Sequence, residues 1–224
     1  LIASPSISAL EKNQDMSNQG VIELLQTWFA EVGFQCTVQP VEASRNKHNL
    51  IASFGSGKGG LLLAGHTDTV PFDEGRWSQD PFTLTEKDNR WYGLGTCDMK
   101  GFFPVALEAA AAFANGKLSA PLTIVATSDE ESSMAGGRYL VESGRPKADY
   151  AIIGEPTELQ PIFAHKGISM MSINIQGSSG HSSDPSLGNN ALDAMHKVMS
   201  ALLDMRAELA AANKNDAFVV NVPT

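Results

Sequence analysis

The chain has 224 residues, of which 42% are hydrophobic and 18% are charged, a composition typical of a globular protein that can bury a core. Its formal net charge is −9 and its basic residues do not cluster, which argues against nucleic-acid binding; no apolar run reaches the roughly 20 residues of a membrane-spanning helix. The two cysteines, Cys36 and Cys97, fit neither a disulfide framework nor a zinc-finger spacing, so we expect a reduced, cytoplasmic protein.

The first two thirds of the chain alternate between extended and helical patterns. Apolar residues at helical spacing predict helices over residues 21–32, 102–113 and 134–142. Short apolar or β-branched runs predict strands over residues 34–41, 49–54, 61–65, 122–127 and 150–153, and a hairpin over residues 82–92. Strands that are apolar on both faces and alternate with helices favour an α/β fold, with a mostly parallel sheet covered by helices on both faces.

The pattern changes after Gly167. Partial alternation of apolar and polar residues predicts a strand over residues 168–176, and a long amphipathic pattern predicts a helix over residues 190–212. A further strand is predicted over residues 218–222. We therefore place a second, smaller α+β unit in residues 167–224.

Acidic and histidine side chains follow the buried strands of the first part. These residues are His66 and Asp68 after the strand 61–65, Glu130 and Glu131 after the strand 122–127, Glu155 after the strand 150–153, and Asp98 before the helix 102–113. Open α/β sheets bind ligands beyond the carboxyl ends of their strands. If these strands are parallel, the side chains converge at one edge of the sheet.

Each of these residues also has a purely structural interpretation. Asp98 could cap the helix that follows it, and Glu130 with Glu131 could form a solvated helix start. Glu155 could be a turn residue before a proline, and His66 could be a core histidine. The convergence of four separate segments on one edge is harder to assign to caps and turns.

Carboxylates crowded at one edge repel one another, and a cation relieves that repulsion. One imidazole with mostly oxygen ligands suits two divalent ions such as zinc, cobalt or manganese, whereas a closed structural zinc site would use cysteines. Asp68 is spaced to accept a hydrogen bond from the His66 nitrogen that faces away from the metal. If Glu130 and Glu131 lie on extended chain they point to opposite sides, so that one binds metal and the other takes a proton from the attacking water.

The motifs AGHTDTVP, GLGTCDMKG, SDEE and GEPT, in this order and spacing, resemble those of the dinuclear-zinc metallohydrolase family that includes aminoacylases and carboxypeptidases. The similarity runs through essentially the whole chain. It implies a zinc-exopeptidase-like catalytic domain in residues 1–166, lacking its C-terminal part, and the first part of a lid and dimerisation domain in residues 167–224. It also implies a homodimer that acts on a small-molecule N-acyl amino acid.

The resemblance implies a role for each candidate ligand. His66 and Glu155 would bind one metal ion, Asp98 would bridge the two ions, and Glu131 would bind the other. The implied cofactors are two divalent metal ions, with zinc preferred and cobalt as the alternative.

The resemblance implies three further roles. Asp68 would orient His66, and Glu130 would be the general base and later the proton donor. His181, in the segment GSSGHSSDP, resembles the lid histidine that stabilises the oxyanion and reaches the site from the partner subunit.

The implied reaction is the removal of an acyl group from the α-nitrogen of an amino acid. Longer segments, including GHTDTVPFDEGRWSQDPF and DEESSMAGGRYL, are most similar to family members that convert N-acetyl-L-ornithine to ornithine and acetate in arginine biosynthesis. Removal of a succinyl group from N-succinyl-diaminopimelate and dipeptide hydrolysis are the alternatives within the family. A non-catalytic binding module and thiol chemistry at Cys97 are the alternatives outside it.

One feature departs from the family pattern. The second metal ion of the family takes a further histidine from near the carboxyl end of a longer chain. His196 is the only histidine after His181, and it lies within the predicted helix 190–212, so it is not that ligand. We therefore expect this chain to be a fragment, with weak or single metal occupancy and little activity of its own.

Overall fold

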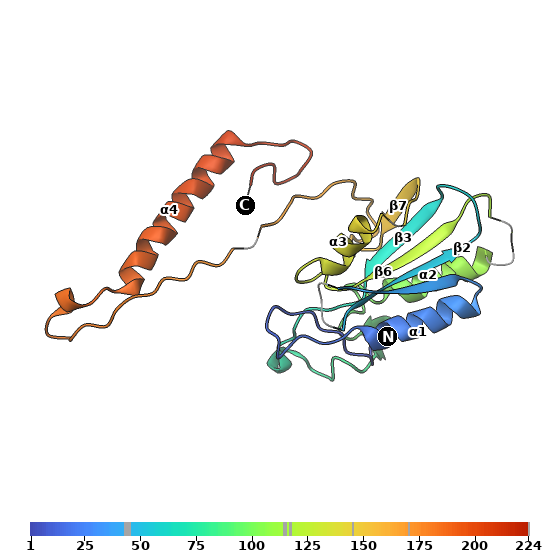
Figure 1. Cartoon of the computed structure of the whole chain (residues 1–224), viewed down its shortest axis with the longest axis horizontal. Coiled ribbons are helices and arrows are strands. Elements are labelled where there is room, and N and C mark those ends of the chain that lie inside the picture. Colours follow the sequence, from blue (N-terminus) through green and yellow to red (C-terminus); the bar gives the residue numbers. More distant parts are fainter. Residues whose placement is uncertain (43–45, 114–115, 117, 145, 170, 224) are drawn as a thin grey trace. The chain divides into compact units, whose positions relative to one another are not determined.

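The structure is a computed structural model that describes all residues of the chain except 43–45, 114–115, 117, 145, 170 and 224. The chain divides into two compact units, Leu1–Ile162 and Phe163–Thr224 (Figure 1). The boundary predicted from the sequence lies after residue 166. The assignment of a catalytic domain and a lid or dimerisation domain to the two parts stays a prediction.

A five-stranded sheet forms the centre of the first unit. In order across the sheet, its strands are β1 (Gln35–Pro40), β2 (His48–Phe54), β6 (Leu122–Thr127), β3 (Leu61–His66) and β7 (Tyr150–Ile153). β3 pairs in parallel with both β6 and β7, whereas β2 is antiparallel to both β1 and β6. Four of the strands therefore run in one direction and β2 runs against them, as expected of a mostly parallel sheet.

The predicted hairpin forms a separate two-stranded sheet. Its strands are β4 (Thr85–Lys87) and β5 (Arg90–Tyr92). The two residues between the strands, Asp88 and Asn89, have φ angles of 53° and 57°. Short polar residues such as these tolerate the left-handed conformation that a tight two-residue hairpin turn requires.

Helices cover both faces of the central sheet. On one face α1 (Gln19–Glu31) and α2 (Phe102–Phe113) share a core with β2 and β6 (Figure 1). This core contains Val21, Ile22, Leu25, Phe29, Phe34, Leu50, Ala52, Phe103, Ala106, Ala110, Ile124 and Ala126. On the opposite face lies α3 (Ala135–Glu142). Successive side chains of a strand point to opposite faces, so Asn49 points away from the core into which its neighbour Leu50 points. The Asn49 Nδ2 donates a hydrogen bond to the carbonyl of Gly136 in α3 at 3.0 Å.

The start of α1 is tied to the strand ends. Ser17 lies one residue before the N-cap Asn18, and its Oγ accepts a hydrogen bond from the Gln19 N–H at 3.1 Å. Asn18 points elsewhere: its Nδ2 donates to the His48 carbonyl and to the Thr67 Oγ1, both at 2.7 Å. The helix start is therefore anchored to the residue that follows His66.

The second unit contains the short 3-10 helix η2 (Pro185–Leu187) and the helix α4 (Ala191–Ala212). α4 begins with the Asn190 side chain accepting a hydrogen bond from the Leu192 N–H at 2.9 Å. The strands predicted over residues 168–176 and 218–222 are wrong, because the described residues of both segments form no strand; Met170 lies outside the described residues. A strand needs a hydrogen-bonding partner as well as an apolar pattern.

Within the described ranges, no helix combines the length and the apolar content needed to cross a membrane.

The core beneath α1 yields a stability prediction. The Phe29 side chain is fully buried, and its ring meets the Phe34 ring edge to face with centroids 5.4 Å apart. Phe29→Ala should lower the free energy of unfolding by about 3–5 kcal/mol, measured by urea denaturation, because it leaves a cavity in a packed core. The control is Leu10→Ala at a side chain that is 76% exposed, where a change of less than about 0.5 kcal/mol is expected. Equal losses in both variants would contradict the assigned core.

Candidate metal centre

The candidate site lies beyond the carboxyl ends of three neighbouring strands. β3 ends at His66, and its parallel neighbours β6 and β7 end at Thr127 and Ile153. Because the three strands run in parallel, the segments that follow them leave the sheet at the same edge. Glu130, Glu131 and Glu155 are on two of these segments.

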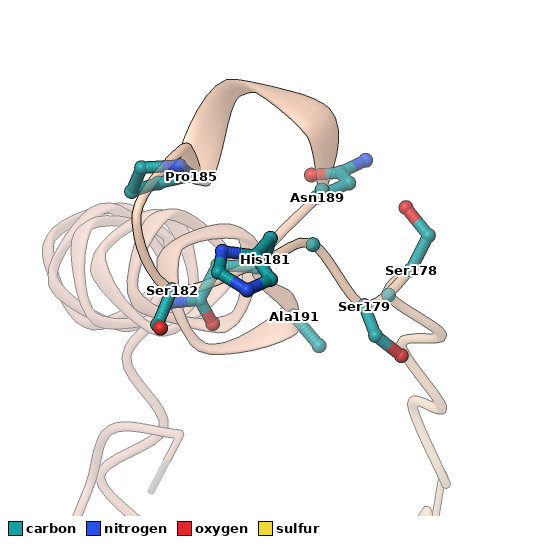
Figure 2. Close-up of a pocket in the computed structure, with 11 residues that line it drawn as sticks. Ser178, Ser179, His181, Ser182, Pro185, Asn189 and Ala191 are labelled. Atoms are coloured by element: carbon teal, nitrogen blue, oxygen red, sulfur yellow. The ribbon is translucent and has the colours of Figure 1, made fainter.

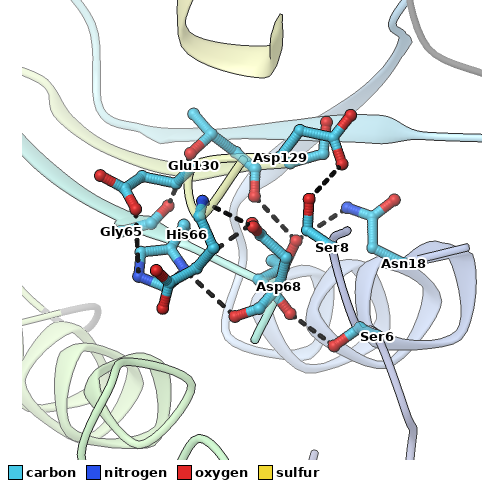
Figure 3. Close-up of polar contacts among 12 residues, drawn as sticks. Ser6, Ser8, Asn18, Gly65, His66, Asp68, Asp129 and Glu130 are labelled. Atoms are coloured by element: carbon cyan, nitrogen blue, oxygen red, sulfur yellow. Dashed lines mark hydrogen bonds and ion pairs between the residues drawn. The ribbon is translucent and has the colours of Figure 1, made fainter. Parts of the chain in front are cut away.

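His66 is at the centre of the cluster. Its Nε2 is 3.0 Å from the Asp98 Oδ1 and 3.9 Å from one carboxylate oxygen each of Glu130 and Glu155. The His66 side chain is only 1% exposed, whereas the side chains of Asp98, Glu130 and Glu155 are 53%, 38% and 37% exposed. A buried imidazole therefore lies next to carboxylates that remain partly exposed to solvent. Figure 3 shows His66 with Glu130 and Asp68 around it.

The side chains around His66 form two groups with the spacing of metal ligands. One group is His66, Asp98 and Glu155, and the other is His66, Glu130 and Glu131; the ligand atoms of each group lie within 4.8 Å of one another. Imidazole nitrogen and carboxylate oxygen are ordinary ligands of zinc and related divalent ions. The donor set therefore fits a divalent cation, and its two halves share His66.

Asp68 holds the His66 ring through its backbone carbonyl and not, as was expected from the sequence, through its carboxylate. The His66 Nδ1 donates to the backbone carbonyl of Asp68 at 3.0 Å, and the Asp68 carboxylate lies 3.7 Å from the same nitrogen. The other carboxylate oxygen, Oδ2, accepts a hydrogen bond from the Glu131 N–H at 3.0 Å. A proton on Nδ1 leaves the Nε2 of the neutral ring as the nitrogen that can bind a metal ion.

Glu130 and Glu131 lie in a turn and not on extended chain. The two side chains were expected to point to opposite sides only if both residues lay on extended chain, and they do not. Each residue offers a carboxylate oxygen within 4.8 Å of the His66 nitrogen. The Asp68 carboxylate fixes the backbone of Glu131 directly. Both glutamates consequently face the same cluster, and their orientation alone does not divide them into ligand and base.

Burial raises the pKa values of acids in the cluster, and neighbouring carboxylates add to the effect for Glu131 and Glu155. Burial raises the pKa of Glu131 to about 7, and the charge of Asp98 adds to the effect. Burial likewise raises the pKa values of Asp68 and Glu155. For His66, burial lowers the pKa, but the surrounding carboxylates outweigh burial and the net pKa is raised. A divalent cation would stabilise the ionised acids.

His181 belongs to the second unit. Figure 2 shows it in a pocket formed by residues 177–191, beside the start of α4. Its Nδ1 accepts a hydrogen bond from the Ser183 N–H at 3.2 Å, so in the neutral ring the proton is on Nε2. The predicted role of His181 at the metal centre stays a prediction.

A set of buried polar residues behind the site was not identified from the sequence. Lys100 and Lys47 are 1% and 3% exposed, and Asp129 is 4% exposed. Burial lowers the pKa of Lys100 to about 8. The sequence signal that could have identified Lys100 is its position just before α2, where the helix dipole disfavours a cation.

The family model for "Peptidase family M20/M25/M40" matches residues 62–220, which includes every candidate site residue. The chain belongs to this family.

Relatives of the M20 chain include a curated protein and several solved structures. The chain is 56% identical over all 224 residues to an acetylornithine deacetylase of Pectobacterium atrosepticum, and it spans 58% of that protein's length. Human carnosine dipeptidase 1 has a TM-score of 0.58 and 24% identity, over 68% of this chain and 36% of its own. A tripeptidase of Staphylococcus aureus has a TM-score of 0.60 and 17% identity, over 89% of this chain and 53% of its own. The two structures confirm the α/β fold.

Metal binding should release protons at neutral pH. In the metal-free protein the pKa of Glu131 is about 7 and that of His66 is raised above 6.5, so both groups must lose protons before they can bind. We expect the Zn²⁺ affinity to fall as the pH drops from about 8 to about 6, by about tenfold per pH unit for each group that is protonated. Competition with a chromophoric chelator across this pH range measures the effect.

Glu131→Gln is the matched variant for this measurement. It should bind Zn²⁺ more weakly at high pH but with a shallower pH dependence, because one titrating ligand is gone. An unchanged slope in Glu131→Gln would show that Glu131 does not titrate with metal binding.

Proposed function

We propose that the protein is a metal-dependent amidohydrolase that removes the acetyl group from N-acetyl-L-ornithine, giving ornithine and acetate for arginine biosynthesis. The observation that supports this best is the cluster of carboxylates around the buried His66 at the carboxyl edge of the sheet. Membership of the M20 family supports a hydrolase, and the relative named acetylornithine deacetylase supports the substrate.

We propose that His66 and Glu155 would hold one divalent ion, that Glu131 would hold a second, and that Asp98 would supply a carboxylate to both. Zinc is the expected metal and cobalt the alternative. When bound, such ions supply Lewis-acid activation of a water molecule and of the amide carbonyl. His66 is the only histidine in either ligand group of the described residues, which leaves carboxylate oxygen as the main donor type.

Glu130 is the proposed general base. One of its carboxylate oxygens lies 3.9 Å from the His66 Nε2, and its side chain is 38% exposed, so it can contact both the cluster and an incoming water. Glu130 takes a proton from the attacking water and later gives it to the leaving amine nitrogen, while Asp68 holds the His66 ring through its carbonyl.

His181 is proposed to donate a hydrogen bond to the developing oxyanion from the partner subunit of a homodimer, with residues 167–224 in the lid and dimerisation domain. The proton on its Nε2 suits that role, because an oxyanion needs a donor. We propose a cytoplasmic location, which is supported by the free thiols of Cys36 and Cys97.

The general-base assignment is tested by Glu130→Gln in the full-length protein. The variant should keep its bound metal, while kcat for N-acetyl-L-ornithine falls by about 10²–10⁴-fold, because the amide cannot accept the proton. Glu108→Gln, at an exposed position on α2, is the matched control and should leave kcat unchanged. Near wild-type turnover of a metal-loaded Glu130→Gln variant would rule out this role.

The substrate assignment is tested by comparing three compounds: N-acetyl-L-ornithine, N-succinyl-diaminopimelate and a dipeptide. The kcat/KM of the zinc-loaded full-length protein should be highest for N-acetyl-L-ornithine, by at least about tenfold. A preference for either of the others would identify the desuccinylase or dipeptidase alternative. Metal binding without hydrolysis of any of the three would favour a non-catalytic binding module.

A further inference from the structure

The N-terminal segment, residues 4–8, lies against the chain that follows His66. The Thr69 N–H donates to the Ser6 carbonyl at 3.1 Å, and the Ser8 N–H donates to the Thr69 carbonyl at 2.9 Å. The Ser6 Oγ also donates to the carbonyl of Thr67 at 2.7 Å. This short parallel pairing fixes the backbone on both sides of Asp68, whose carbonyl holds the His66 ring (Figure 3).

The same segment is bonded to the loop that contains Asp98. Lys100 is 1% exposed, and its Nζ donates to the carbonyls of Leu1 and Ser4 at 3.3 and 3.1 Å and to the Ser6 Oγ at 3.4 Å. An ammonium group has three protons, so residues 4–8 supply acceptors for two of them and Leu1 supplies the third. Gly95 leaves room for this side chain, because a Cβ there would lie 2.8 Å from the Lys100 Cε.

A third contact reaches the loop that contains Glu130 and Glu131. The Ser8 Oγ donates to the Oδ1 of Asp129 at 3.0 Å, as Figure 3 shows. The same carboxylate oxygen is 2.8 Å from the Nζ of Lys47, and both side chains are buried. Asp129 is the residue directly before the two glutamates, so this buried ion pair sets where their turn begins.

We propose that residues 4–8 form a positioning segment that holds three of the four ligand-bearing segments of the metal centre in register, namely those of His66, Asp98 and Glu130–Glu131, with Ser8 and Lys100 as its positioning residues. The inference rests on the proposed metal site. The sheet aligns the strand ends, but the loops after them depend on other contacts. Second-layer hydrogen bonds of this kind orient metal ligands, and their loss typically weakens metal binding 10–100-fold.

The test uses Ser8→Ala and Lys100→Met in the full-length protein, with Co²⁺ as the probe. Each variant should bind Co²⁺ about 10–100-fold more weakly than the wild type. The visible absorption bands of the bound Co²⁺ should also change in position or intensity, because they report the geometry of the ligands. Lys12→Met, at an exposed lysine of the same N-terminal region, is the matched control and should leave both readouts unchanged.

The readouts separate positioning from folding and from substrate choice. Circular dichroism of the metal-free variants checks that they are folded, and if Lys100→Met is not, Ser8→Ala decides, because it removes one hydroxyl oxygen. A folded Ser8→Ala variant with wild-type Co²⁺ affinity and spectrum would overturn the inference. Since neither readout uses a substrate, an error in the proposed deacetylase activity would not affect the result, whereas a wild type that does not bind Co²⁺ would overturn the metal site itself.

Discussion

The crowding of carboxylates around one buried imidazole is the constraint on which the site depends. Asp98, Glu130 and Glu155 all lie within 3.9 Å of the His66 Nε2, and burial raises the pKa of Glu131 to about 7. Such a cluster lowers the stability of the metal-free fold, because like charges repel and desolvated acids take up protons. A divalent cation would relieve this repulsion. The free energy by which the repulsion destabilises the metal-free protein would then be recovered on metal binding and would strengthen it.

Positive charge lies behind this acidic cluster, and it is used to hold the backbone. Lys47 pairs with Asp129, and Lys100 bonds to the N-terminal segment, so that each buried ammonium group has partners other than the candidate ligands. A buried charge without a partner would be strongly unfavourable, so the fold must place these partners next to each ammonium group. The ligand carboxylates thereby remain available on the solvent side.

The elements that the sequence predicted well are those with strong local patterns. α2, β6 and β7 have the predicted bounds. An alanine-rich segment with helical spacing and short runs of apolar residues identify these elements from a few neighbouring residues alone. The predicted strands over residues 168–176 and 218–222 are wrong, because the described residues of these segments pair with no other strand. The reversed direction of β2 was not predictable either, because the apolar pattern of a segment shows that it is extended but not in which direction it runs in the sheet.

By itself, the sequence determined which residue types follow the strands, namely a histidine at the end of a buried apolar strand and acids after two neighbouring strands, and it determined the match to the M20 family over residues 62–220. Only the tertiary structure decided that the Asp68 carbonyl holds the ring, that Glu130 and Glu131 face the same cluster, and that residues 4–8 connect the ligand loops. The physical reason is that these features depend on turn torsions and on long-range contacts. Ser6 and Thr67 are 61 positions apart in the sequence, and Ser8 and Asp129 are 121 positions apart. Local periodicity contains no information about such contacts.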